Sequence, residues 1–314
     1  MKTGRVALAV VVLVTLELLL TTPSSFPATS LAYAKGMPSA ELAMAGMQTN
    51  PPVGQAQESG PSQSAPKYTK EQLEEFKKQN ERAAAINALI QQAQTAISAK
   101  NWKDAVPPLQ QLVAMDPTGW PFYSSLGDAQ LNLGQYEQAI ETYEKGIQGA
   151  ERKSAVDPAN PSSDTAAKKA GTAKMLTNTG NAYLKLRKND EAVAAYTKAA
   201  AMDPNPATAY FNLCATQYNI GNTEGALNAC GKAIATDPNK ADAYFIKGSV
   251  LMAESTVTKD GKTLAPAGTV EALKKYLQLA PNGGHVADVK QMLDYLDGKS
   301  EADGDSQKSK SKAQ

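Results

Sequence analysis

The stretch that decides the fold is AKMLTNTGNAYLKLRKNDEAVAAYTKAAAMDPNP at residues 173–206, followed by ATAYFNLCATQYNIGNTEGALNACGKAIATDPNK at residues 207–240. The two segments have the same length of 34 residues, and small or proline residues recur between them in register. Self-similarity with a fixed period of roughly 20 to 50 residues is the signature of a repeat architecture. Pairs with the 34-residue spacing are Ala105–Ala139, Gly180–Cys214, Cys214–Gly248, Ala192–Ala226 and Pro204–Pro238.

Two longer spacings interrupt the period. Ala139 and Ala192 are 53 residues apart, which is one period and 19 further residues. Ala226 and Ala272 are 46 residues apart, which is one period and 12 further residues. We therefore expect insertions at 154–172 and 255–267.

The content of each period resembles the tetratricopeptide repeat, a helix–turn–helix unit. In that family the first helix carries a bulky residue, Leu-Gly and Tyr, and the second carries Ala, an aromatic residue and a later Pro. The resemblance implies an all-α fold, an α-solenoid of about five repeats at 86–119, 120–153, 173–206, 207–240 and 241–284. The third repeat matches best, with Leu176, Gly180, Tyr183, Ala192, Tyr196, Ala199 and Pro204.

The spacing of small and breaking residues has a physical explanation. Small residues stand where the two helices of a pair approach most closely, and each pair buries its apolar face only against its neighbours. The Asp-Pro pairs at 116–117, 203–204 and 237–238 are predicted to end second helices, because proline disfavours helix at the residue before it. Gly134 and Gly221 are predicted to make turns between helices. Pro107-Pro108 is expected to loosen or kink the second helix of the first repeat.

Further segments extend the repeats. Thr69 and Gln72 form a predicted capping box for one long helix ending at Ser98, and its first part, 69–85, is either a coiled-coil arm or a packing extension. Asp260-Gly261 predicts a hairpin within 256–264. Thr269 is expected to cap the helix that follows, and residues 285–297 are expected to form a capping helix over the last repeat.

The two ends of the chain read differently from the repeats. Residues 1–34 are predicted to be a signal peptide, with Lys2 and Arg5 before an apolar run and Ala32-Tyr33-Ala34 as the cleavage site. The alternative is an uncleaved anchor, which would be the chain's only link to a membrane. Residues 35–68 and 298–314 contain few large apolar residues and are predicted to be a disordered linker and a disordered tail. Residues 162–164, Ser-Ser-Asp, are expected to cap the helix after the first insertion.

Composition excludes several classes of function. The chain has 42% hydrophobic residues, 20% charged residues and a formal net charge of +1, so it lacks the basic surplus of a nucleic-acid-binding protein. It has one histidine, His285, which we expect at the surface, and two cysteines. These numbers disfavour a metal or haem site and most nucleophilic catalysis. We therefore predict no enzyme activity, no cofactor and no metal.

The resemblance also implies a binding site, since tetratricopeptide arrays bind partners mainly with the first helix of each repeat. Asparagine amides both donate and accept hydrogen bonds, and aromatic rings hold apolar side chains. Alternatively, the asparagines are merely tolerated there and the aromatic residues pack between repeats. The candidate groove residues are Asn178, Asn181, Phe211, Asn212, Tyr218, Phe245 and Met252.

One specificity known in the family does not fit this sequence. A related subfamily grips a C-terminal carboxylate with Lys, Asn and Arg residues, and Asn181 and Asn212 occupy its two asparagine places. Thr177, Asp242 and Ile246 occupy the places of its basic residues. An anionic C-terminus would meet no positive clamp here, so we reject that specificity.

Cys214 and Cys230 leave two interpretations open. Both are predicted to point between the helices of the fourth repeat. In an exported chain they invite a disulfide. An offset of about one helical turn would place their Cα atoms beyond the ~7 Å that a disulfide spans, and they would then be two small buried thiols.

The sequence therefore predicts an exported scaffold, periplasmic or extracellular, that binds a protein or peptide in its concave groove. The alternatives are a holdase-like chaperone with little sequence specificity and a self-assembling envelope protein. Neither the partner nor the oligomeric state follows from the sequence.

Overall fold

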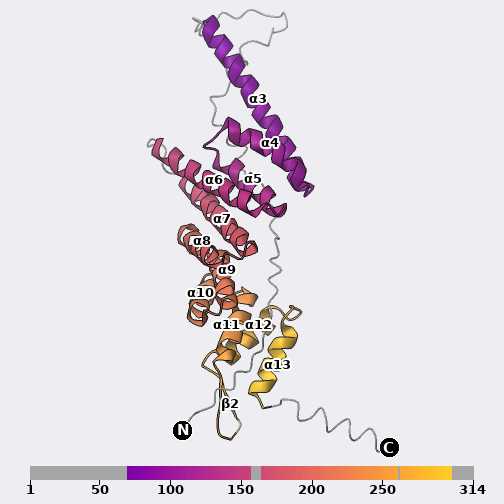
Figure 1. Cartoon of the computed structure of the whole chain (residues 1–314), viewed down its shortest axis with the longest axis vertical. Coiled ribbons are helices and arrows are strands. Elements are labelled where there is room, and N and C mark those ends of the chain that lie inside the picture. The colour runs from indigo at the N-terminus through magenta and orange to yellow at the C-terminus, as the bar shows by residue number, and fades with distance from the viewer. Residues whose placement is uncertain (1–68, 157–163, 261, 299–314) are drawn as a thin grey trace, which may run out of the picture. The chain divides into compact units, whose positions relative to one another are not determined.

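A computed structural model describes residues 69–156, 164–260 and 262–298 (Figure 1). The predicted signal peptide, the linker, the tail and the Ser162-Ser163 part of the predicted cap lie outside these residues. The described chain forms two compact units, which we treat separately. The N-terminal unit contains α3 (Lys70–Ser98), α4 (Trp102–Met115), α5 (Trp120–Asn132) and α6 (Tyr136–Val156).

The C-terminal unit contains the remaining elements, and the all-α prediction is confirmed. Within each unit, helices that follow one another in sequence pack against one another as helix–turn–helix pairs. The elements are α7 (Asp164–Lys185), α8 (Asn189–Met202), α9 (Ala207–Asn219), α10 (Thr223–Thr236), α11 (Ala241–Ala253), β1 (Thr256–Val257), β2 (Thr263–Leu264), α12 (Thr269–Leu279) and α13 (Val286–Leu296).

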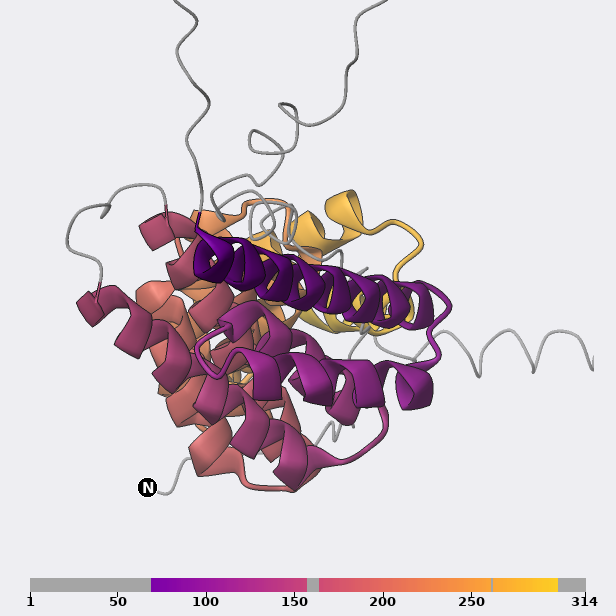
Figure 2. The same cartoon turned by 90° about the horizontal axis from the view of Figure 1, so that it is seen from above.

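The long helix α3 begins as its sequence indicates. The Thr69 hydroxyl accepts a hydrogen bond from the Gln72 backbone N–H, and the Gln72 side chain accepts one from the Thr69 N–H. Only the second half of α3 is packed, with Ile86, Ile90 and Ile97 buried against α4 and α5. The first half extends beyond the end of α4 in Figure 1, while both views show the two helices side by side (Figures 1 and 2).

The turns within four helix pairs share one left-handed position. Gly134 and Gly221 have φ of 75° and 77°, as expected for turn glycines. Lys100 and Arg187 hold the equivalent places in the first and third repeats with φ of 54° and 59°. L-residues adopt this conformation at a cost of about 1–2 kcal/mol, so these two turns are set by the packing of the helices around them.

Other local signals are confirmed or corrected. The helix α4 continues through Pro107 and Pro108 from Trp102 to Met115, so the prolines do not break it. Strands β1 and β2 pair antiparallel, which confirms the hairpin. Thr269 is not a cap: Gly268, with φ of 86°, is the N-cap of α12, and the buried Thr269 hydroxyl donates to the Pro266 carbonyl at 2.7 Å. The left-handed glycine turns the chain into α12 one residue earlier than expected.

The two helices of a pair meet closely at one small residue. A Cβ atom added at Gly180 would lie 2.6 Å from Cε1 of Tyr196, and an added Cβ at Gly127 would overlap the ring of Tyr143. Both tyrosines are fully buried. Their hydroxyls donate hydrogen bonds of 2.7 Å to the residue after each glycine, Tyr143 to Asp128 and Tyr196 to Asn181.

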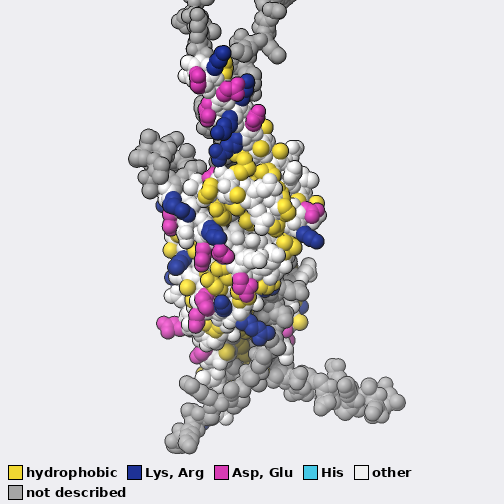
Figure 3. All heavy atoms as spheres, turned by 45° about the horizontal axis from the view of Figure 1, so that its top comes forward, with side chains coloured by type: hydrophobic (Ala, Val, Ile, Leu, Met, Phe, Trp, Pro, Cys, Tyr) yellow, Lys and Arg dark blue, Asp and Glu magenta, His cyan; other side chains and the backbone are white. Residues whose placement is uncertain are grey.

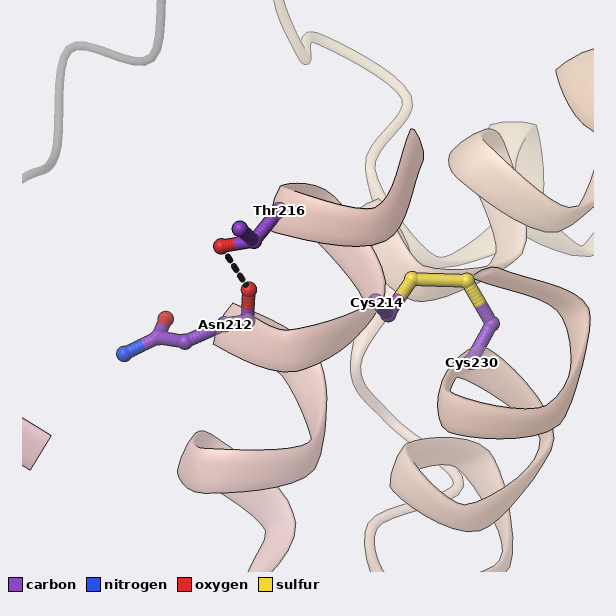
Figure 4. Close-up of a disulfide and its surroundings, with 4 residues drawn as sticks. All are labelled: Asn212, Cys214, Thr216 and Cys230. Atoms are coloured by element: carbon purple, nitrogen blue, oxygen red, sulfur yellow. Dashed lines mark hydrogen bonds between the residues drawn. A yellow bond between two sulfur atoms is a disulfide. The ribbon is translucent and has the colours of Figure 1, made fainter. Parts of the chain in front are cut away.

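In the fourth repeat a disulfide takes the place of this glycine–tyrosine contact (Figure 4). Cys214 and Cys230 lie 34 residues after Gly180 and Tyr196, and both are fully buried. Their Cα atoms are 4.9 Å apart, so the offset that we considered from sequence does not separate them. The residue after Cys214 is Ala215, which suits a partner that has no hydroxyl to pair.

This equivalence predicts that the disulfide can be replaced by the contact of the third repeat. The triple variant Cys214→Gly/Ala215→Asn/Cys230→Tyr should melt at the same temperature with and without reductant. Reduction of the natural protein should cost about 3 kcal/mol, since the bond closes a loop of about 15 residues. The double variant without Ala215→Asn should be about 1–3 kcal/mol less stable than the triple variant, because its buried phenol has no acceptor.

Chemical denaturation of the three proteins, with and without dithiothreitol, measures these differences. A triple variant less stable than the reduced natural protein would contradict the equivalence of the two contacts.

Candidate protein-binding face

The structure divides the seven candidate groove residues into two groups. All of them lie on α7, α9 and α11 of the C-terminal unit. Asn181 and Phe245 are buried, with 7% and 1% of their surfaces exposed. The other five are partly exposed and are Asn178, Phe211, Asn212, Tyr218 and Met252.

Asn181 is a structural residue, so the prediction that it lines an open groove is wrong. Its Oδ1 accepts the hydrogen bond from Tyr196, and its Nδ2 donates to Oδ1 of Asn178 at 3.3 Å. Burial raises the pKa of Tyr196, so its phenol stays protonated and keeps this donor. A hydroxyl carried by the second helix thus draws the asparagine into the pair, and Asn178 is tied to it from one helical turn away.

Phe245 is also misassigned as a groove residue, because the chain beyond the repeats covers it. Its ring stacks on His285 with centroids 3.9 Å apart and planes 4° apart, and it contacts the ring of Tyr276. The His285 backbone N–H donates to the Tyr276 hydroxyl at 3.0 Å. His285 is therefore half-buried, not a plain surface residue, and it starts the predicted capping helix α13, whose Val289 is fully buried.

Asn212 presents its amide on the side of α9 that faces away from the disulfide. In Figure 4 its side chain and that of Cys214 leave the helix in opposite directions. The backbone carbonyl of Asn212 accepts a hydrogen bond of 2.7 Å from the Thr216 hydroxyl. Within the residues that the structure describes, the Asn212 side-chain amide itself has no hydrogen-bond partner. A neutral group that both donates and accepts is thus available on this face.

Two aromatic residues of α9 flank this amide in sequence. Phe211 and Tyr218 pack part of their rings against the apolar cluster that includes Phe245, so packing between repeats explains their inner edges. Burial also raises the pKa of Tyr218, which keeps its phenol neutral. The Lys240 ammonium lies 5.2 Å from the centre of the Phe211 ring, a cation–π contact that no pattern in the sequence indicated.

The remaining candidate, Met252, lies near the end of α11. Its Sδ accepts a weak hydrogen bond from the Ser255 hydroxyl at 3.8 Å. No recorded contact joins it to Asn178 or Asn212, so the structure does not unite the five partly exposed residues in one contact group. We name Phe211, Asn212 and Tyr218 the α9 face, and treat Asn178 and Met252 as separate.

Charges do not give this region a dominant sign. Asp242 is exposed and Ile246 is buried, so neither position provides the positive clamp of the carboxylate-binding subfamily. Over the surface in view in Figure 3, Lys and Arg side chains are mixed with Asp and Glu, with hydrophobic side chains between them. An uncharged segment of a partner therefore suits the α9 face better than an acidic or basic one.

Two further observations concern the described residues alone. They hold no group of three or more His, Cys, Asp or Glu side chains placed to bind a metal ion. None of the helices in 69–156, 164–260 and 262–298 combines the length and apolar character that a membrane span needs.

Comparisons with known proteins agree with the repeat pattern. A tetratricopeptide repeat model matches residues 90–155, and a TPR repeat model matches residues 180–221. No curated protein matches the chain.

Among solved structures, PilF of Pseudomonas aeruginosa is 18% identical, with a TM-score of 0.49 over 69% of this chain and 86% of that one. YrrB, described as a TPR protein with an unusual peptide-binding site, is 17% identical, with a TM-score of 0.48 over 68% and 97%. A MamA protein of Desulfovibrio magneticus RS-1 is 16% identical, with a TM-score of 0.48 over 64% and 97%. At these scores the three likenesses carry no functional argument.

The two asparagines of this region should respond oppositely to truncation. Asn181→Ala leaves the buried Tyr196 hydroxyl without an acceptor and should destabilise the protein by about 1–3 kcal/mol. Asn212→Ala removes a side chain with no partner and should change stability by less than about 0.5 kcal/mol. Urea denaturation of both variants tests the assignment, and a large loss in Asn212→Ala would show that its amide is structural.

Proposed function

Because the chain is a tetratricopeptide repeat protein, we propose that it is an adaptor that binds an extended segment of a partner protein on the α9 face. Repeat proteins of this family are generally non-enzymatic scaffolds, and the proposed mechanism involves binding without chemistry. The single observation that carries the proposal is the Asn212 amide, partly exposed and without a hydrogen-bond partner among the described residues.

The chemistry of the α9 face suits a peptide backbone. One asparagine amide can donate to a backbone carbonyl and accept from a backbone N–H of an extended chain, which holds that chain in register. The outer edges of Phe211 and Tyr218 offer apolar contact for side chains on either side of that bond. Lys240, held over the Phe211 ring, and the exposed Asp242 put opposite charges near the same region.

In-cell photo-crosslinking tests this proposal. A photoreactive amino acid at position 218 should give one dominant adduct with a partner protein, and Asn212→Ala should reduce that adduct severalfold. The matched control is Asn228→Ala, because Asn228 is an exposed amide on α10, the second helix of the same repeat. This control should leave the adduct unchanged.

Three results would contradict the adaptor. An adduct that is insensitive to Asn212→Ala would place binding elsewhere. Adducts with many unrelated proteins would favour the holdase-like chaperone. Adducts only with further copies of this chain would favour self-assembly.

We also propose that the protein is exported. The apolar run after Lys2 and Arg5, and the small residues at 32 and 34, support cleavage after Ala34. The Cys214–Cys230 disulfide supports it independently, because disulfides persist mainly in oxidising compartments.

Export predicts a defined mature N-terminus. Protein recovered from a bacterial envelope or culture medium should begin at Lys35, since signal peptidase cuts after a small residue. Ala34→Phe should block this cleavage and leave the precursor intact. N-terminal sequencing measures both, and recovery of the natural chain with its first 34 residues would sink the cleaved-leader proposal.

A further inference from the structure

The N-terminal unit contains a pocket that the proposed function does not use. It lies among α4, α5 and α6 and has a volume of about 480 Å³. Its polar and apolar parts are separate in kind: Val113, Ala114 and Leu126 supply hydrocarbon, while Glu141 and Lys145 are exposed and paired with each other at 2.6 Å. An exposed ion pair of this kind needs no further partner, so the pocket offers ligands its interior.

Gln130 is the residue of this pocket that calls for a ligand. Only 7% of its surface is exposed. Its Oε1 is fully buried and has no hydrogen-bond partner within the described chain. The great majority of buried acceptors in proteins are paired, and an unpaired one costs about 1–3 kcal/mol.

The third repeat shows what this fold puts at the same place. Gln130 and Tyr183 are 53 residues apart, which is the offset that also relates Gly127 to Gly180. The third repeat thus carries a phenol ring where the second has a shorter amide. Gln217 holds this place in the fourth repeat with an equally unpaired Oε1, but its amide is packed against Gly225.

We propose that the pocket receives a tyrosine side chain of a partner protein. Its ring would take the place that Tyr183 fills in the next repeat, in contact with Val113 and Leu126. Its hydroxyl would donate a hydrogen bond to Gln130 Oε1. A phenol meets both requirements, because it combines a flat apolar body with one donor at its tip.

The test uses the full chain and two probes that differ by one hydroxyl group. N-acetyl-tyrosinamide should bind saturably and shift the methyl resonances of Val113 and Leu126. N-acetyl-phenylalaninamide should bind about tenfold more weakly, because it excludes water from Oε1 without pairing it.

Two substitutions at position 130 separate the parts of the proposal. Gln130→Met keeps the length of the side chain but removes the acceptor, so both probes should bind equally. Gln130→Tyr should fill the pocket as in the third repeat and abolish binding of both probes. The matched control is Gln111→Met, since Gln111 is an exposed glutamine on α4 outside the pocket lining, and it should bind like the natural protein.

Circular dichroism of each variant confirms folding, and Gln130→Met alone decides the matter if Gln130→Tyr fails to fold. Equal binding of both probes to the natural protein would overturn the proposal, as would unchanged binding to folded Gln130→Tyr. The absence of any methyl shift with millimolar N-acetyl-tyrosinamide would overturn it too. Each outcome is independent of the α9 face, which lies in the other unit.

Discussion

Each helix pair of this protein depends on a close approach between its two helices at one small residue. Gly127 and Gly180 lie so near to Tyr143 and Tyr196 that no larger side chain fits. In the fourth repeat the Cys214–Cys230 bond joins the same two places covalently. Three chemically different pairs thus meet one geometric requirement, because stacked helix pairs have a common spacing and every pair must match it.

The same approach decides which polar residues belong to the interior. A tyrosine on the second helix brings a hydroxyl into a dry interface, where it needs an acceptor. Asp128 and Asn181, each one residue after the glycine, provide that acceptor. Ala215 follows Cys214, whose partner has no such hydroxyl. Asn212 lies two residues before Cys214 and therefore leaves α9 on the opposite side, which frees its amide for a partner.

Candidate binding sites arise where one repeat departs from the others. In the last repeat, the stacking of His285 on Phe245 closes the apolar surface and takes Phe245 out of the groove. In the second repeat, Gln130 stands where the third has Tyr183, and a pocket with an unpaired acceptor results. A repeat architecture tolerates such departures, because each repeat contacts only its neighbours and the remaining stack still folds.

The sequence by itself determined the period, the helices, the capping box at Thr69, the glycine turns and the hairpin. These depend on interactions within a few residues, or on a spacing that the chain repeats. Only the tertiary structure decided that Asn181 and Phe245 are buried, that Lys100 and Arg187 adopt left-handed turns, and that Gln130 lines a pocket. Each of these depends on distances between side chains of different helices.

The disulfide stands between the two cases. Cys214 and Cys230 have the 16-residue separation of Gly180 and Tyr196, so their correspondence was present in the sequence. The level at which two antiparallel helices face each other was not, because it depends on how the turn and the packed side chains set the second helix against the first.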